Sequence, residues 1–140
     1  MEIRRYEHGE GDLWQRVGPL LVSAAVRREL GAPISSDEST VWWLAINEAG
    51  ETVGFVTARR REGVWEFRHD YVVPAARGQG VYEQLFQARL QEWLASKAPA
   101  ARATVNERSL SVYQRHGFRP IGQRGQYTVV QRERGTNEPV

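Results

Sequence analysis

Two glycines placed between a predicted strand and a predicted helix constrain this chain more than any other feature. An apolar run at residues 71–74 (Tyr-Val-Val-Pro) is followed at 77–82 by Arg-Gly-Gln-Gly-Val-Tyr, which opens an amphipathic stretch. Glycine lets backbone N–H groups approach a ligand closely, and a helix start leaves about four N–H donors unpaired. The helix dipole adds partial positive charge there, and the Arg77 guanidinium adds a full charge. The order strand, tight turn, helix therefore predicts a binding site for a phosphate group.

Composition excludes several classes of protein. The chain has 140 residues, which is enough for one domain with a sizeable core. It contains no run of about 18 apolar residues, so we expect no membrane span, and its first residues lack the apolar stretch of a secretory signal. The absence of cysteine excludes disulfides, thiol catalysis and thiolate metal sites, and favours a reducing cytoplasm. The three histidines, His8, His69 and His116, have no metal-ligand spacing, so we expect no metal.

Arginine supplies nearly all of the positive charge, since Lys97 is the only lysine, and the formal net charge is +2. This mildly basic balance is weak support for an acidic partner. We interpret the cluster Arg59-Arg60-Arg61 as a solvated turn between two strands, because such runs usually face solvent. The alternative is that these arginines contact phosphates or nucleic acid.

Hydrophobic periodicity and turn residues predict the order of the elements. We expect strands at residues 2–6, 41–46, 53–59, 64–73, 103–105, 118–121 and 127–132, and helices at 13–30, 78–96 and 107–115. Asp12 is placed to cap the first helix, and Pro19 is expected to split or kink it. The order predicts a single α/β domain over residues 1–134 with a mixed sheet, followed by a disordered tail at 135–140.

Two blocks of the sequence resemble signatures of a known enzyme family. Residues 72–81 (Val-Val-Pro-Ala-Ala-Arg-Gly-Gln-Gly-Val) resemble the acyl-CoA-binding motif of the GNAT superfamily of N-acetyltransferases, Arg/Gln-x-x-Gly-x-Gly/Ala. Residues 106–109 (Asn-Glu-Arg-Ser), followed by Val112-Tyr113 and Gly117-Phe118, resemble its second signature. The resemblance extends over residues 2–134. It implies a mixed, mostly antiparallel central sheet flanked by helices, with a splayed acyl-CoA-binding cleft.

The resemblance also implies a reaction, the transfer of an acetyl group from acetyl-CoA to a primary amine by direct attack in a ternary complex. The residues it implies for cofactor binding are Val72, Val73, Arg77, Gly78, Gln79, Gly80, Val81, Tyr82, Asn106, Ser109 and Tyr113. The backbone at 71–73 would pair with the pantetheine arm like an added strand, and the turn at 77–81 would hold the diphosphate. Tyr113 stands at the family's tyrosine position, and a phenol with a pKa of about 10 keeps a proton for the CoA thiolate at neutral pH.

One residue departs from the family pattern. The last small position of the first motif is Tyr82, where the family has Gly or Ala. Tyr82 shares a helical face with Phe86, Leu90 and Trp93, so we expect a ring that faces the core. The alternative is a ring that lines or reshapes the cofactor groove.

The general base is less well defined by the sequence. Glu66 stands where some family members carry a catalytic glutamate on this strand, and Asp70 is the second carboxylate candidate. His69 is a candidate for a base or a substrate contact. Strand alternation predicts that Glu66, Arg68 and Asp70 share one face and that His69 points to the other. Alternatively, each carboxylate forms a surface ion pair and the amine loses its proton to a chain of water molecules.

Other polar and aromatic residues have two interpretations each. Asn106 is a candidate for holding substrate or cofactor through its amide, and it is equally suited to cap the following helix. Ser109 either contacts the cofactor or only packs. Trp42 and Trp43 point to opposite faces of one strand, so we expect one in the core and consider the other a candidate wall of the acceptor pocket.

Two further functions stay open at this point. One is a nucleic-acid modifier that acylates a nucleobase amine, and the other is a noncatalytic module that binds acyl-CoA. The acceptor site is expected between the region 13–40 and the last hairpin at 118–130, which carry no recognisable motif. As partners we expect a small-molecule or peptide amine and no membrane, and the chain is expected to be a monomer or a homodimer.

Overall fold

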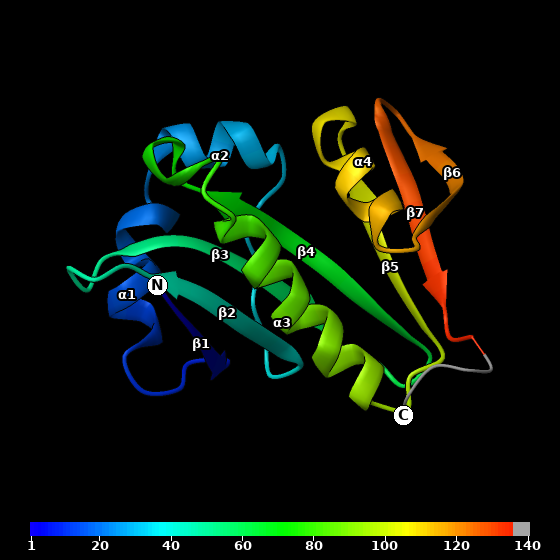
Figure 1. The fold of residues 1–140 in the computed structure, drawn as a ribbon, viewed down its shortest axis with the longest axis horizontal. Helices are drawn as coiled ribbons and strands as arrows, with labels where there is room; N and C mark the ends of the chain where they lie inside the picture. The colour runs from blue at the N-terminus through cyan, green and yellow to red at the C-terminus, as the bar shows by residue number, and fades with distance from the viewer. Residues whose placement is uncertain (136–140) are drawn as a thin grey trace.

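A seven-stranded sheet runs through the molecule, and helices cover both of its faces (Figure 1). The computed structural model describes residues 1–135. The strand order is β1-β2-β3-β4-β5-β7-β6, in which β4 and β5 are the parallel pair and the other neighbours run antiparallel. This arrangement confirms the expected mixed, mostly antiparallel α/β architecture. Within the same residues, no helix combines the length and apolar character needed to cross a membrane.

The elements follow the order that the periodicity predicts. The strands are β1 (Glu2–Glu7), β2 (Thr40–Ile46), β3 (Thr52–Arg59), β4 (Val64–Val72), β5 (Ala100–Val105), β6 (Arg119–Arg124) and β7 (Tyr127–Glu133). The helices are α1 (Leu13–Leu21), α2 (Ala24–Leu30), α3 (Val81–Ala95) and α4 (Glu107–Arg115), and a 3-10 turn covers Pro74–Ala76. Of the tail expected at 135–140, only Gly135 belongs to the described residues.

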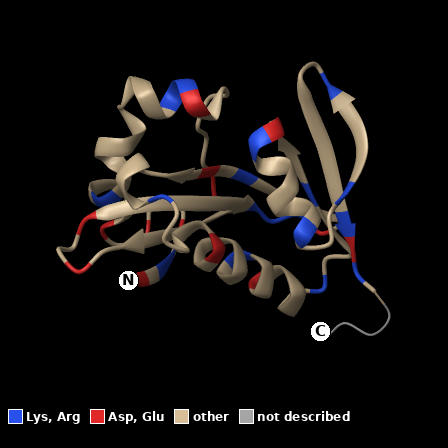
Figure 2. Ribbon diagram, turned by 45° about the horizontal axis from the view of Figure 1, so that its top comes forward, with Lys and Arg blue, Asp and Glu red and all other residues tan. Residues whose placement is uncertain are grey.

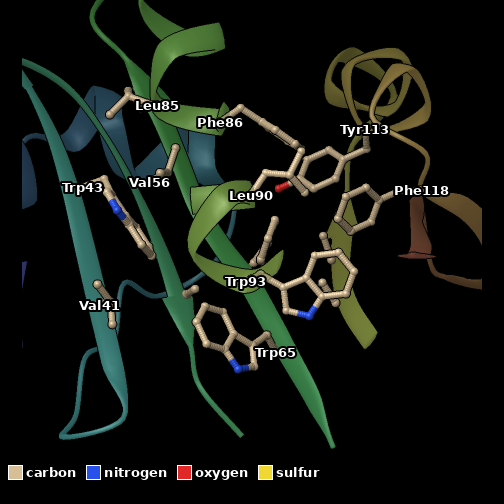
Figure 3. Close-up of a cluster of buried hydrophobic side chains, with 14 of the residues drawn as sticks. Val41, Trp43, Val56, Trp65, Leu85, Phe86, Leu90, Trp93, Tyr113 and Phe118 are labelled. Atoms are coloured by element: carbon tan, nitrogen blue, oxygen red, sulfur yellow. The ribbon is translucent and has the colours of Figure 1, made fainter. Parts of the chain in front are cut away.

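The larger core lies between the sheet and α3, which crosses one face of it (Figure 1). Trp93 and Phe86 of α3 are fully buried and pack toward β4 and β5, together with Tyr113 of α4 (Figure 3). Large aromatic side chains contribute much apolar area to such a core. This packing holds α4 and the start of α3 on the same side of the sheet, which places both helices beside the same cleft.

The second core lies on the opposite face, beneath α1 and α2. Trp42 belongs to this core and Trp43 to the other, and both are almost fully buried. The prediction that they point to opposite faces is therefore confirmed. Neither ring is left as a wall of an acceptor pocket, because helices cover both faces of β2.

The expected helix at 13–30 is two helices. Pro19 lies inside α1, and the break comes after it, where Ser23 accepts a hydrogen bond from Val26 N and caps α2. Asp12 is the N-cap residue of α1 as expected, but its side chain makes no capping hydrogen bond. Its carboxylate instead accepts hydrogen bonds from the Tyr6 hydroxyl and the Arg16 Nε. Helix α2 ends at Gly31, which has a left-handed φ of 68°.

Three further boundaries differ from the expectation. Helix α3 begins at Val81, because Gly78 and Gly80 both have positive φ and form the turn before it. Strand β5 begins at Ala100, which pairs with Val64 and Glu133 of its two neighbours. The last hairpin is longer than expected, since β6 continues to Arg124 and pairs there with Tyr127.

Candidate active site

The strands β4 and β5 separate halfway along their length. Their parallel pairing runs from Val64 opposite Ala100 to Phe67 opposite Ala103, and no pair follows, although both strands continue. The two ribbons diverge visibly beyond this point (Figure 1). The second half of β4 therefore presents backbone groups on one edge without a neighbouring strand, and such an edge can pair with an extended ligand.

A cavity of about 890 Å³ occupies this separation. Its walls come from β4, β5, the start of α4, the end of α2 and the β6–β7 hairpin. Tyr127 of β7 reaches the end of α2, since a side chain carbon at Gly31 would lie 2.6 Å from the Tyr127 hydroxyl. Helix α2 and strand β7 thus approach each other across the cleft, and only glycine fits at their contact.

The glycine turn leads from β4 into α3 as the sequence predicts. Gly78 and Gly80 have φ angles of 77° and 80°, which favour glycine, and a side chain carbon at either position would meet no atom within 4 Å. Gly80 is the N-cap residue of α3 and offers no side-chain acceptor. The first N–H groups of the helix, at Val81 and Tyr82, therefore have no intrahelical partners.

Arg77 is held in place by neighbouring residues. Its Nε donates to Val72 O at 2.8 Å, and its Nη2 donates to both carboxylate oxygens of Glu29 at 2.7 Å. Glu29 also lies 3.5 Å from Arg108 Nη1 at the start of α4. One carboxylate of α2 thereby connects the glycine turn with α4 across the mouth of the cleft.

The orientation of Asp70 corrects the alternation expected for β4. His69 has a positive φ of 54°, and the pairing of β3 with β4 shifts between Phe55 and Thr57, which marks a bulge at this point. The extra residue reverses the side-chain faces that follow it. Asp70 therefore points toward α3 and α4, whereas Glu66 and Arg68 remain on the opposite face of the sheet.

Asp70 lies at the centre of a buried polar network. Its carboxylate accepts hydrogen bonds from Arg89 Nη1 at 2.6 Å and Nη2 at 2.9 Å, and from the hydroxyls of Tyr113 at 2.7 Å and Tyr82. Arg89 also donates to the Tyr113 hydroxyl at 3.1 Å. The Arg89 guanidinium lies over the Phe67 ring, 4.3 Å from its centroid. Oδ2 accepts three of these hydrogen bonds and Oδ1 accepts one, so Asp70 orients two tyrosines and one arginine.

Burial and charge set the proton affinities of this network. Burial raises the pKa of Tyr113 well above its ordinary value of 10.0, while the Arg89 charge lowers it and the Asp70 charge raises it. Burial and the Asp70 charge likewise raise the pKa of Tyr82. Burial alone would lower the pKa of Arg89, but the Asp70 carboxylate raises it. Both tyrosines are therefore protonated and Arg89 is charged at neutral pH.

Tyr82 faces the core at the position where the sequence departs from the family pattern. Its ring packs edge-on against Phe86, with 6.0 Å between centroids, and its hydroxyl donates to Asp70. The cavity wall includes three of the expected cofactor residues, Tyr113, Asn106 and Ser109. The others lie beside the cleft, at Val72, Val73 and 77–82.

Glu66 and His69 line the same cavity but differ in environment. Glu66 is 40% exposed and lies 3.4 Å from Arg61 Nε. Burial and the nearby Arg68 charge lower the pKa of His69 to about 4, and its Nε2 accepts a hydrogen bond from Ser35 N at 3.2 Å. His69 is therefore neutral at pH 7, and the nitrogen that could accept a proton is engaged by the backbone.

Asn106 caps α4, since its side-chain oxygen accepts from Ser109 N at 2.9 Å. This contact confirms the capping interpretation, and Asn106 also lines the cavity.

The Arg59–Arg61 cluster does not form a continuous basic surface. Arg59 lies 3.3 Å from Asp37, Arg60 pairs with Glu7, and Arg61 lies near Glu66. Each guanidinium therefore has its own carboxylate, as expected for a turn between two strands.

The sequence interpretation missed Arg89, although a signal for it was present. Arg89 lies three residues after Phe86 and four before Trp93, on the stripe of α3 that otherwise carries apolar residues. An arginine at such a position is buried and needs a carboxylate partner. The partner is Asp70, 19 residues earlier in the chain, and nothing local identifies it.

Comparisons with known proteins identify the family and the fold. The family model described as an acetyltransferase (GNAT) domain matches residues 17–130. No curated protein gives a significant match. Escherichia coli ElaA shares 18% identity with a TM-score of 0.79, covering 95% of this chain and 100% of that one. An acyl-CoA N-acyltransferase from Pseudomonas aeruginosa shares 18% identity with a TM-score of 0.75, covering 94% and 98%. A GNAT family acetyltransferase from Elizabethkingia anophelis with acetyl-CoA bound shares 15% identity with a TM-score of 0.64, covering 95% and 97%.

At these identities the structural likeness shows the fold, a GNAT-type sheet with its flanking helices. The family match spans most of the chain, and the chain therefore belongs to the GNAT acetyltransferase family. As a member of this family, it is an acyl-CoA-dependent N-acyltransferase.

Proposed function

We propose that this protein transfers an acetyl group from acetyl-CoA to a primary amine while both are bound. The observation that carries the proposal is the free edge of β4, which lies between the glycine turn and the cavity lined by Tyr113. Acetyl-CoA supplies an activated acyl group on a thioester. Attack by the amine nitrogen forms the amide bond and breaks the C–S bond, while one proton leaves the amine and one reaches the sulfur.

The free backbone groups support a specific mode of cofactor binding. Val72 and Val73 would pair with the amides of the pantetheine arm, as an added strand does. Residues 78–82 would bind the diphosphate through N–H groups at the positive end of the α3 dipole. Asn106 and Ser109 would contact the same arm from α4. This set retains the expected cofactor residues, with Arg77 ordering the turn through its contact with Val72 O.

Tyr113 is proposed as the acid that protonates the sulfur. Tyr113 lines the cavity, and the Arg89 Nη2, 3.1 Å from its hydroxyl, would stabilise the phenolate that forms when the proton is given up. Asp70 holds the hydroxyl in position through its own hydrogen bond. Asp70 therefore acts as a positioning residue in this proposal.

Glu66 is proposed as the group that takes the amine proton. It lines the cavity and is partly exposed, so water can connect it with the amine. Position and access thus favour Glu66 over Asp70, whose oxygen atoms are occupied by four donors.

The test measures thiol release and the mass of the product with acetyl-CoA and a panel of amines. Tyr113→Phe is expected to lower kcat about 100-fold, a typical contribution of a general acid. The affinity for acetyl-CoA, measured by calorimetry, is expected to stay unchanged. Tyr82→Phe is the matched control, because it removes another hydrogen bond to Asp70 from a side chain outside the cavity wall.

Full turnover in Tyr113→Phe, or equal losses in Tyr113→Phe and Tyr82→Phe, would remove Tyr113 from the acid role. For Glu66→Gln we expect loss of the limb of the pH–rate profile that reports deprotonation of the base. A profile that matches wild type would remove Glu66 from the base role. Acetyl-CoA binding without product from any amine would favour the noncatalytic alternative.

A further inference from the structure

The cavity contains more positive than negative charge. Its walls include six arginines, namely Arg59, Arg61, Arg68, Arg102, Arg108 and Arg124, and three carboxylates, namely Glu29, Glu66 and Asp70. Basic segments are visible on α4 and on the β6–β7 hairpin, which both contribute to the cavity wall (Figure 2). The fold therefore gathers around this cavity much of the arginine that the composition supplies.

The carboxylates of the cavity wall already have partners. Asp70 is paired with the fully buried Arg89, which lies behind the wall. Glu29 lies between Arg77 and Arg108, and Glu66 lies near Arg61. Each of these carboxylates is therefore already in contact with at least one arginine.

Three arginines of the wall lack such a partner. Within residues 1–135, no carboxylate lies within 4 Å of Arg68, Arg102 or Arg124. Arg102 donates to the uncharged Gln131 amide oxygen. Arg68 and Arg102 lie on neighbouring strands and on the same face of the sheet, beside the point where β4 and β5 separate. The cavity thus presents three guanidinium groups that no carboxylate of the described residues contacts, and Glu66 is shared among Arg61, Arg68 and Arg102 as a neighbour.

Arg68 is the most confined of the three. It is partly buried, whereas Arg102 and Arg124 are exposed. Burial is the main cause that lowers the pKa of Arg68. The Glu66 and Asp37 carboxylates raise it, and the Arg59 and Arg61 charges lower it. A guanidinium in this position is stabilised by any anion that reaches it, because water is partly excluded.

We infer that the acceptor of this enzyme is an amine that also carries an acidic group, a carboxylate or a phosphate, and that Arg68 binds that group. This inference rests on the proposed function. A cationic acceptor such as a polyamine would be repelled by the same charges. The unbalanced charge also favours the neutral form of a nearby amine, which is the form that attacks. The cavity volume of about 890 Å³ lies in the range of small-molecule sites, so a small acidic molecule fits it.

The test compares acceptors that differ only in charge. One pair is 6-aminohexanoate and its amide, and the other is phosphoethanolamine and ethanolamine. Spermidine represents a cationic acceptor. For at least one pair, the kcat/KM of wild type is expected to be about tenfold higher with the acidic member than with the uncharged one. This factor corresponds to one hydrogen-bonded contact with a charged group. Arg68→Gln is expected to remove this preference by raising KM for the acidic member only, and Arg68→Lys to restore part of it. Arg119→Gln is the charge-matched control, since Arg119 is exposed outside the cavity wall.

A second measurement does not depend on turnover. Binding of glutarate and of inorganic phosphate is followed by calorimetry, and Arg68→Gln is expected to raise the dissociation constant of at least one probe about tenfold relative to Arg119→Gln. If no amine is acetylated but this difference is found, the anion site stands and the acetyltransfer proposal fails. Acetylation without an acidic preference, a preference for spermidine, equal behaviour of the two variants, or acetylation of an oligonucleotide alone would overturn the inference.

Discussion

Replacing Arg89 with methionine is expected to destabilise the protein, because it breaks a buried ion pair. The Arg89 side chain is 0% exposed and that of Asp70 is 12% exposed, so methionine leaves a carboxylate with little access to water. Removal of one partner of such a pair costs about 3–5 kcal/mol of unfolding free energy. With an unfolding entropy of roughly 2.1 cal/mol/K per residue, this loss lowers the Tm of the 140-residue chain by roughly 10–17 °C.

Two more variants separate the effect of charge from that of side-chain volume. Asp70→Asn keeps the shape and leaves the Arg89 guanidinium buried without an anion, so a similar loss of about 3–5 kcal/mol is expected. The double variant Arg89→Met/Asp70→Asn removes both charges. Its loss is expected to be smaller than the sum of the single losses by about 0.5–3 kcal/mol, the range found for residues in direct contact.

The assay is urea unfolding at pH 7, followed by tryptophan fluorescence, with the midpoint and the m-value compared between variants. Arg5→Met is the control, because Arg5 and Glu92 also form an arginine–carboxylate pair, but one exposed at the surface. Its loss is expected to stay below about 1 kcal/mol. Losses that small in both single variants, or losses that simply add in the double variant, would refute the reasoning.

Three more expectations follow from single residues. Between pH 6.5 and 4 the unfolded chain binds a proton at His69 that the folded protein excludes, because burial lowers its pKa to about 4. The unfolding free energy therefore falls by at most about 3 kcal/mol as the pH drops through this window, and His69→Asn is expected to lack this fall. Parallel curves of unfolding free energy against pH for wild type and His69→Asn would contradict this. Gly80→Ala is expected to lower the unfolding free energy by about 1–2 kcal/mol, because Gly80 has a positive φ. Gly18→Ala, inside helix α1, is expected to raise it by about 0.5–1 kcal/mol. Equal urea midpoints for the two variants would refute this difference. Arg134 donates hydrogen bonds to four backbone carbonyls at and after the end of α3. A chain truncated after Glu133 is therefore expected to lose about 2 kcal/mol of unfolding free energy. A chain truncated after Arg134 is expected to have the same Tm as the full chain. Identical melting curves for the two truncations would place the end of the domain elsewhere.

Local chemistry made much of the fold predictable. The β-branched and aromatic run of β2, the apolar stripe of α3 and the cap at Asn106 depend on residues close together in the chain. Such patterns identify elements and their order. Boundaries were less predictable, as at β5, because Ala100 belongs to a strand only through its pairing with distant residues.

The site was predictable to a different extent at each residue. The turn with Gly78 and Gly80 was evident, because positive φ is a local demand that glycine meets. The direction of Asp70 was not, since the bulge at His69 arises where β4 pairs with β3 and reverses the alternation. A single inserted residue moved Asp70 from the face of Glu66 to the face of Tyr113.

The sequence by itself determined the class of the fold, the glycine turn at the start of α3 and the tyrosine on α4, because each depends on short-range periodicity or on the conformational freedom of one residue. The tertiary structure decided which charges are balanced. Arg59, Arg60 and Arg61 look alike in sequence, yet each contacts a carboxylate from another element, while within residues 1–135 no carboxylate contacts Arg68 of the adjacent strand. The physical reason is that ion pairing depends on distances of a few ångströms between residues that are far apart in the chain.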